Sequence, residues 1–120
     1  MTIIGSWKGA DTMSKYLIQG NYTAEGIKGL IKDGGSARKE AVEKLARSVG
    51  GTLESINFSS TGSIGYVVVM NLPDKAAAAA ISAAVIASGA LSVTQSVELL
   101  TPAEMDEAAK KVPDYRAPGR

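Results

Sequence analysis

The stretch 52–74, TLESINFSSTGSIGYVVVMNLPD, constrains the fold of this chain most strongly. It contains two apolar-rich runs, 53–58 and 66–70, separated by the polar cluster SSTGS. Two β-prone runs around such a cluster predict a β-hairpin with a loop of several residues. The three valines at 67–69 are apolar toward both faces of a sheet, which predicts a central strand. The Pro-Asp pair at 73–74 ends the hairpin, and its Asp is placed to cap a helix.

The segment before the hairpin predicts one strand and two helical elements. Residues 15–22, KYLIQGNY, are predicted to form the first strand, with Leu17, Gln19 and Asn21 on one side and Tyr16, Ile18, Gly20 and Tyr22 on the other. Thr23 is predicted to cap a short helical turn weakened by glycine, and Ser36 to cap a longer helix over 37–49. The apolar positions of the longer helix recur at helical spacing and form one stripe: Val42, Leu45, Ala46 and Val49.

The segment after the hairpin predicts an alanine-rich helix over 74–88, a strand over 91–100 and a final helix. Residues 101–104, TPAE, combine a capping box with proline at the first helical position, which predicts a helix to about residue 111. The tail 113–120 contains two prolines and a glycine and is predicted to be extended. On the last strand, the predicted apolar face is Leu91, Val93, Val97 and Leu99, and the predicted polar face is Ser92, Thr94, Ser96 and Glu98.

The predicted order is strand, helix, strand, strand, helix, strand, followed by a terminal helix. This order is typical of a ferredoxin-like βαββαβ sandwich, an α+β fold in which two helices cover one face of a four-stranded antiparallel sheet. The chain then divides into a flexible leader (1–14), one domain (15–112) and an extended C-terminal tail (113–120). The second sheet face has no predicted cover, so we expect another copy to bury it and form a dimeric α+β barrel with a cavity. That face is expected to carry Gln19, Asn21, Ser55, Asn57, Thr94 and Ser96.

Composition excludes several classes of function. The 13 Lys and Arg against 12 Asp and Glu give a net charge of +1, so no general field attracts nucleic acid or an anionic membrane. The chain has no Cys and no His, which excludes thiol chemistry and removes the commonest general base and transition-metal ligand. No metal and no cofactor are therefore expected. No apolar run reaches the roughly 20 residues of a membrane helix, and the N-terminus lacks a signal-peptide pattern, so a cytoplasmic protein is expected.

Several short motifs resemble those of one bacterial family. Tyr-Thr-x-Glu-Gly at 22–26, Gly-Gly at 50–51 and Pro-Asp at 73–74 are spaced as in the GYD-domain family. The tail DYRAPG at 114–119 also resembles a Tyr-Arg-Pro-Pro-Gly ending of such proteins. The resemblance covers most of the chain and implies a ferredoxin-like fold of the dimeric α+β barrel group. It implies no established activity.

The chain departs from that family at one position of interest. The motif that names the family has Gly, then Tyr-Asp, at the entry to the third strand. The corresponding positions here are Gly62, Ile64 and Gly65, and Tyr66 is the nearest aromatic residue. Because the acid is missing, chemistry that depends on it is not expected in this protein. The departure favours binding or assembly.

Polar and aromatic side chains on the predicted strands are the first candidates for a site. Tyr16, Tyr22 and Tyr66 could line a cavity, although tyrosines on strands are more often core residues with a satisfied hydroxyl. Four polar side chains could form a pocket between subunits or the hydrated part of a dimer interface: Gln19, Asn21, Asn57 and Thr94.

Three further candidates lie outside the strands. Arg38, in the first turn of the long helix, matches an arginine of the family that it resembles and could bind a carboxylate, with a surface ion pair as the alternative. Tyr115 and Arg116 lie in the proline-containing tail. They could dock on a neighbouring subunit, or belong to a frayed end.

Together these features predict a homodimer or higher oligomer that is a small-molecule-binding or assembly module without an evident catalytic motif. The alternative is a cofactor-free dimeric-barrel enzyme, similar to monooxygenases or isomerases, with a cavity Tyr or Glu as its acid or base. Glu54 and Glu98 are the carboxylates available for that role. A cavity with one of them beside Tyr66 would favour the enzyme, whereas a lining of amides and valine would favour binding. A sheet-to-sheet interface with no cavity would favour a purely structural subunit.

Overall fold

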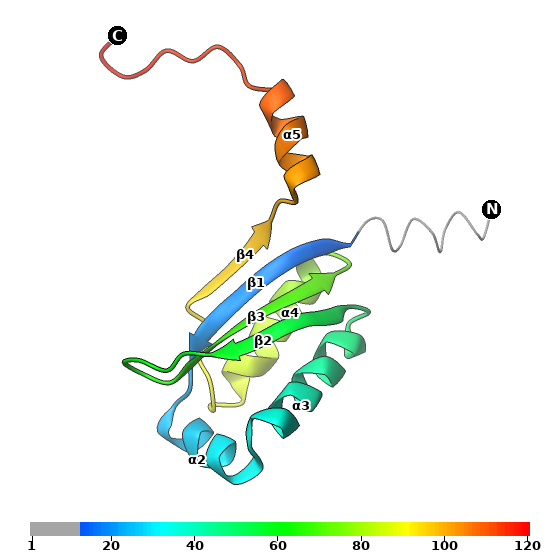
Figure 1. Ribbon diagram of the computed structural model, residues 1–120, viewed down its shortest axis with the longest axis vertical. Coiled ribbons are helices and arrows are strands. Elements are labelled where there is room, and N and C mark those ends of the chain that lie inside the picture. The colour runs from blue at the N-terminus through cyan, green and yellow to red at the C-terminus, as the bar shows by residue number, and fades with distance from the viewer. Residues whose placement is uncertain (1–12) are drawn as a thin grey trace, which may run out of the picture.

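The computed structural model describes residues 13–120 (Figure 1). Its strands are β1 (Ser14–Asn21), β2 (Thr52–Phe58), β3 (Gly65–Leu72) and β4 (Gln95–Leu99), in the antiparallel order β2-β3-β1-β4. Its helices are α2 (Ala24–Asp33), α3 (Gly35–Ser48), α4 (Lys75–Ala87) and α5 (Pro102–Lys110). The predicted α+β class and the four-stranded antiparallel sheet are confirmed. Most of the predicted leader, residues 1–12, lies outside the described residues.

The hairpin forms as predicted, with β2 and β3 paired in antiparallel register. Its loop turns at Gly62, whose φ of 71° is a left-handed conformation that favours glycine. The Ser59 hydroxyl closes the loop, because it donates to the Ser63 carbonyl at 3.0 Å and accepts from the Gly65 amide at 2.7 Å. β3 then lies between β2 and β1 in the sheet, which is the central position expected of its valines.

The core lies on one face of the sheet, because buried residues alternate with half-buried ones along β1 and β3. Ile18, Met70 and Leu72 are at most 1% exposed. The helices supply the other side of this core: Val42 and Ala46 from α3, and Ala77, Ala78 and Ile81 from α4. α3 and α4 therefore cover the same face (Figure 1), and within residues 13–120 no helix covers the opposite face, which we call the open face.

The corner between α2 and α3 differs from the prediction. α2 is a full ten-residue helix capped by Thr23, and α3 follows it after the single residue Gly34. Gly34 has φ 85°, which only glycine adopts readily, so the chain turns there and re-enters a helix at once. Ser36 therefore lies inside α3, and the prediction that it caps this helix was wrong.

The prediction for the last strand was wrong about the residue at which it begins and about which side chains lie on each face of the sheet. Leu91 forms an isolated bridge with Tyr22, and regular pairing begins with Gln95 opposite Gln19. Three residues of the last segment thus lie opposite two residues of β1, which is one extra residue. Such an insertion turns every later side chain to the other face of the sheet.

This shift exchanges the faces that were predicted for β4. Leu91 and Val93 pack against the core as expected. Val97 and Leu99, however, lie opposite Leu17 and Lys15, on the open face. The polar residue Ser96 lies opposite Ile18, a core residue on the covered face, so its prediction for the open face was wrong as well.

α5 projects from the end of β4 away from the sheet (Figure 1). Its predicted capping box is present: Thr101 Oγ1 accepts from the Glu104 amide at 3.1 Å, and the Glu104 carboxylate accepts from the Thr101 amide at 2.9 Å. No residue of α5 is buried. The helix is thus locally well formed and packs little against the rest of the described chain.

Candidate functional site

Three aromatic side chains meet where β1 and β2 end and β3 begins. The ring of Tyr22 lies edge-on to Tyr66, with centroids 6.0 Å apart, and 6.3 Å from the ring of Phe58. The Tyr66 hydroxyl donates to the Ser92 carbonyl at 2.8 Å. Tyr66 is therefore a core residue with a satisfied hydroxyl, which is the common role of strand tyrosines.

Tyr22 and Arg38 differ from Tyr66 because each has a buried polar atom without a partner. The Tyr22 hydroxyl and the Arg38 Nε are shielded from solvent and make no hydrogen bond within residues 13–120. Burial raises the pKa of Tyr22, and the Arg38 guanidinium lowers it in part through its charge and its close approach to the phenol, although no contact between the two side chains has the geometry of a hydrogen bond. Arg38 takes part in none of the ion pairs of the described chain, so the surface ion pair is not seen.

Tyr22 and Arg38 form the inner wall of a cavity between α2 and α3. Its volume is about 180 Å³, and its remaining lining comes mainly from α2, from the first two turns of α3 and from Ala90 and Leu91. Gly29 opens this cavity, since a β-carbon at Gly29 would have no neighbouring atom within 4 Å. The carboxylates of Glu25 and Asp33 also line it.

Burial raises the pKa of both tyrosines, Tyr22 and Tyr66. Burial raises the pKa of Tyr66, the neighbouring Tyr22 raises it further, and Arg38 lowers it. Both phenols are thus protonated near neutral pH and act as hydrogen-bond donors there. A small gap of about 20 Å³ in the core touches Tyr22, Arg38 and Tyr66, and of these three only Tyr22 and Arg38 also line the larger cavity.

A second depression, on the open face, brings together most of the predicted polar pocket. It has a volume of about 260 Å³ and is lined by Gln19, Asn21, Tyr66, Val67 and Thr94, among others. Most of its polar groups already have partners. Gln19 donates to Gln95 at 3.0 Å, Asn21 accepts from Ser63 at 3.0 Å, and Thr94 donates to the Gln19 carbonyl at 3.2 Å.

Asn57 is the member of the predicted pocket that does not line this depression. It lies on exposed β2, opposite Val67. Tyr115 and Arg116 also lie apart from both cavities. Tyr115 is 78% exposed, and Arg116 donates to the carbonyl of Arg120 in its own tail.

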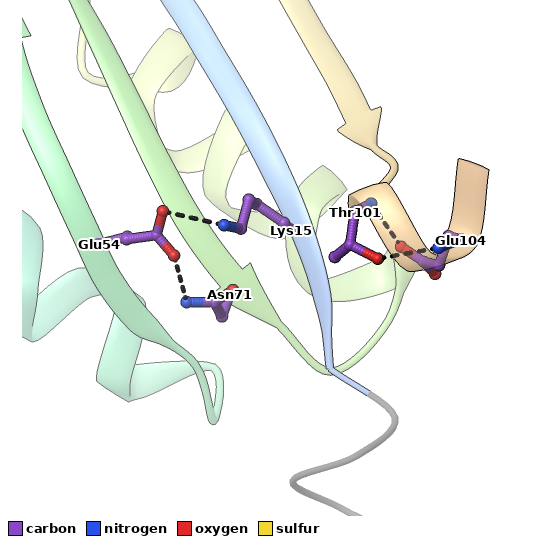
Figure 2. Close-up of polar contacts among 5 residues, drawn as sticks. All are labelled: Lys15, Glu54, Asn71, Thr101 and Glu104. Atoms are coloured by element: carbon purple, nitrogen blue, oxygen red, sulfur yellow. Dashed lines mark hydrogen bonds and ion pairs between the residues drawn. The ribbon is translucent and has the colours of Figure 1, made fainter. Parts of the chain in front are cut away.

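Neither predicted catalytic carboxylate lies beside Tyr66. Glu54 pairs with Lys15 at 3.1 Å and accepts from Asn71 at 3.4 Å, and these hydrogen bonds lower its pKa (Figure 2). Asn71 is five residues from Tyr66 along β3, roughly 17 Å at 3.4 Å per residue. Glu98 is exposed and lies opposite Tyr16, also far from Tyr66 along the sheet.

The described chain contains no group of three or more acidic side chains placed to hold a metal ion. Among its helices, none has both the length and the apolar character needed to cross a membrane.

A comparison with protein-family models found a match: the family model described as the GYD domain matches residues 16–109 of the chain. The chain belongs to the GYD-domain family. A search of curated proteins found no match, and a search of solved structures found none either. A β-carbon at Gly65 would lie 2.5 Å from the Gly20 carbonyl oxygen. An acidic side chain at residue 65 would need the backbone to move.

Sequence reasoning identified Tyr22 and Arg38 separately but missed the cavity that joins them. The missing members are Gly29, Leu30 and Asp33 on α2. One signal was present: Gly26 and Gly29 are three residues apart and so lie on one side of a helix. A β-carbon at Gly26 would overlap the Ala90 carbonyl, so this side of α2 lies against the chain before β4.

Proposed function

We propose that this GYD-domain protein is a small-molecule-binding module and that the cavity between α2 and α3 is its binding site. One observation carries the proposal: Tyr22 and Arg38 both line the cavity, and the Tyr22 hydroxyl and the Arg38 Nε are buried without partners within the described residues. A buried polar group left unpaired costs about 1–3 kcal/mol, so native structures rarely keep two of them together. A ligand that accepts hydrogen bonds from both recovers part of this cost.

The chemistry of the wall indicates the class of ligand. A guanidinium and a protonated phenol both donate hydrogen bonds, and a carboxylate accepts from both. The volume of about 180 Å³ is of the size that admits a compound with one ring, since cavities of roughly 150 Å³ bind benzene. Glu25 and Asp33 at the same cavity disfavour a second negative charge on the ligand. The proposed ligand is therefore a small organic monocarboxylate.

Benzoate and its neutral analogue benzamide test the site directly. Binding to the folded protein raises the melting temperature, and benzoate is expected to raise it more than benzamide because only benzoate is anionic. Replacing Arg38 by Gln should abolish this difference. The proposal is wrong if benzoate gives no shift, or if both compounds shift the wild type equally.

A cavity-filling pair of variants separates the site from general effects of charge. Gly29 lines the cavity and a β-carbon there would meet no atom within 4 Å, so Gly29→Leu is chosen to fill the cavity, whereas Gly29→Ala adds one methyl group and serves as the matched control. Gly29→Leu is expected to lose benzoate binding, and Gly29→Ala to keep most of it. Equal binding by both variants would place the ligand elsewhere.

The second part of the proposal is assembly: a ferredoxin-like sandwich that pairs through its open face into a dimeric barrel. The open face supports this because its central side chains are apolar. Leu17 lies directly between Val69 and Val97 in the register of the sheet, and Val67 and Leu99 extend the same patch. All five are only half-buried in the single chain. A second copy is the partner that suits such a patch, because a twofold contact sets the same surface against itself.

A charge in the middle of this patch tests the assembly. Leu17→Lys is expected to shift the particle mass from at least two chains to one chain of 12.4 kDa, as measured by light scattering at micromolar concentration. The control is Lys28→Leu, an exposed change on α2, outside the sheet. A wild type that is already monomeric contradicts the assembly but leaves the benzoate test unaffected.

The enzyme alternative receives less support from the geometry. The depression beside Tyr66 is lined by amides, Val67 and Thr94, and neither Glu54 nor Glu98 reaches it. General acid–base catalysis needs a titrating group within hydrogen-bond reach of the substrate. The lining therefore favours binding.

A further inference from the structure

The proposed binding cavity has one acidic and one basic wall. α2 and α3 form these walls and meet in a corner at Gly34 (Figure 1). Among the described residues that line the cavity, Glu25 and Asp33 on α2 are the acids, and Arg38 on α3 is the cation. A ligand in this cavity therefore meets charges of both signs.

The spacing of the lining residues on α2 indicates which acid faces the cavity most directly. The five lining positions of α2 are 25, 26, 29, 30 and 33. At about 100° per residue they fall within an arc of about 140° around the helix. Asp33 lies near the middle of this arc, between Gly26 and Gly29, and Glu25 lies at its edge. Asp33 is therefore the acid that the helix places centrally on its cavity side.

Asp33 is also the acid that is available to a ligand. Glu25 pairs with Lys28 at 3.3 Å, one turn further along α2. Asp33 takes part in none of the ion pairs of residues 13–120, and neither does Arg38. The carboxylate and the guanidinium thus line one cavity without forming an ion pair with each other.

The helix ends at this corner favour the same distribution of charge. Asp33 is the last residue of α2, where the carbonyls of a helix carry partial negative charge and favour a cation. α3 begins at Gly35 with no side-chain cap and no acid in its first turn. The start of α3 therefore favours an anion, on the same helix as Arg38.

We propose that the ligand of this cavity is a zwitterion, a small organic acid with one carboxylate and one primary ammonium group. Arg38 and Tyr22 bind the carboxylate, and Asp33 binds the ammonium. A ligand with a carboxylate alone leaves the acidic wall without an opposite charge, whereas a zwitterion presents the complementary charge to each wall. This ligand class narrows the proposed function of the cavity and depends on it.

Two ligands of nearly equal shape test the ammonium group. 5-Aminopentanoate and hexanoate share the carboxylate and the chain length, and differ in whether the far end is an ammonium or a methyl group. An NMR titration of the full-length protein at neutral pH measures both affinities. We expect 5-aminopentanoate to bind about fivefold more tightly, the upper range for a partly exposed ion pair. Without an opposite charge, the desolvation of the ammonium would favour hexanoate instead.

Asp33→Asn removes the proposed partner of the ammonium with little change in shape. Asp33 is exposed, so the fold is expected to tolerate this substitution. The variant should lose the preference for 5-aminopentanoate and keep its affinity for hexanoate. Asp106→Asn is the matched control, because it removes the same charge from α5, outside the cavity lining, and should keep the wild-type preference.

The outcomes separate the zwitterion from the binding site itself. If the wild type binds hexanoate as tightly as 5-aminopentanoate, the zwitterion is overturned, but the cavity remains a site for monocarboxylates. A preference that persists in Asp33→Asn, or that Asp106→Asn also loses, overturns the role of Asp33. Binding of neither compound contradicts the proposed function and the zwitterion together.

Discussion

The two faces of the sheet are built from neighbouring residues but have opposite environments. On the covered face, Ile18 and Val68 are 1% and 4% exposed beneath α3 and α4. On the open face, Leu17 and Val69 are equally apolar yet only half-buried. A face that is apolar without a cover in its own chain is typical of an interaction surface. The comparison therefore shows that one chain completes its core on one side of the sheet and, in our proposal, needs a second copy on the other.

The sharpest test of this comparison is a pair of adjacent alanine substitutions. Ile18→Ala is expected to lower the free energy of unfolding by about 2–5 kcal/mol, whatever the protein concentration, because it opens a cavity in the covered core. Leu17→Ala should cost about 1 kcal/mol in a dilute monomer and more as the concentration rises. Urea unfolding at two concentrations measures both. Equal, concentration-independent losses would mean that the faces do not differ as described.

Alanine substitutions at two glycines, Gly20 and Gly29, compare a crowded and an open position of the backbone. A β-carbon at Gly20 would overlap the Ser92 carbonyl, where the extra residue before β4 approaches β1, whereas a β-carbon at Gly29 meets open space. Gly20→Ala is therefore expected to destabilise by about 1–3 kcal/mol. Gly29→Ala should stabilise by up to about 1 kcal/mol, because alanine favours the helix more than glycine does. Thermal unfolding of both variants under identical conditions measures whether Gly20→Ala lowers, and Gly29→Ala raises, the stability relative to the wild type.

The smallest effect is expected at the Glu54 ion pair on the edge of the open face. Hydrogen bonds from Lys15 and Asn71 hold the pKa of Glu54 below its ordinary value of 4.5. A carboxylate with a lowered folded-state pKa stabilises the fold above its unfolded pKa, and this contribution is lost as the pH falls through the folded value. The stability difference between wild type and Glu54→Gln should thus be present at pH 6 and be lost as the pH falls below 4.5 and through the lowered folded-state pKa. A difference that grows on acidification would contradict this assignment.

Much of the fold could be predicted from the spacing of apolar residues and from the residues that begin and end helices and strands. The valine-rich run, the Pro-Asp pair after it and the capping box at Thr101 each indicate one local structure, and each was confirmed. The faces of β4 could not be predicted, because its side chains alternate evenly across the extra residue in sequence. Only pairing with β1 shows that Leu91 and Val97 face opposite sides.

The candidate site was harder to predict because it depends on a corner. Tyr22 and Arg38 stood out singly, as an aromatic residue on a predicted strand and a cation in the first turn of a predicted helix. Their shared cavity exists because Gly34 lets α3 follow α2 without a loop. Gly29 shows its role only in three dimensions, since the space beside it is a property of the packed helices.

The most direct test of the central claim is native mass spectrometry of the full-length protein purified from its own host. We expect an assembly of at least two chains of 12.4 kDa that carries one small molecule of defined mass per chain. The same assembly from the Gly29→Leu variant should lack that mass. A wild type that is detected as a single chain without a bound small molecule would contradict both the pairing of open faces and the binding site between α2 and α3.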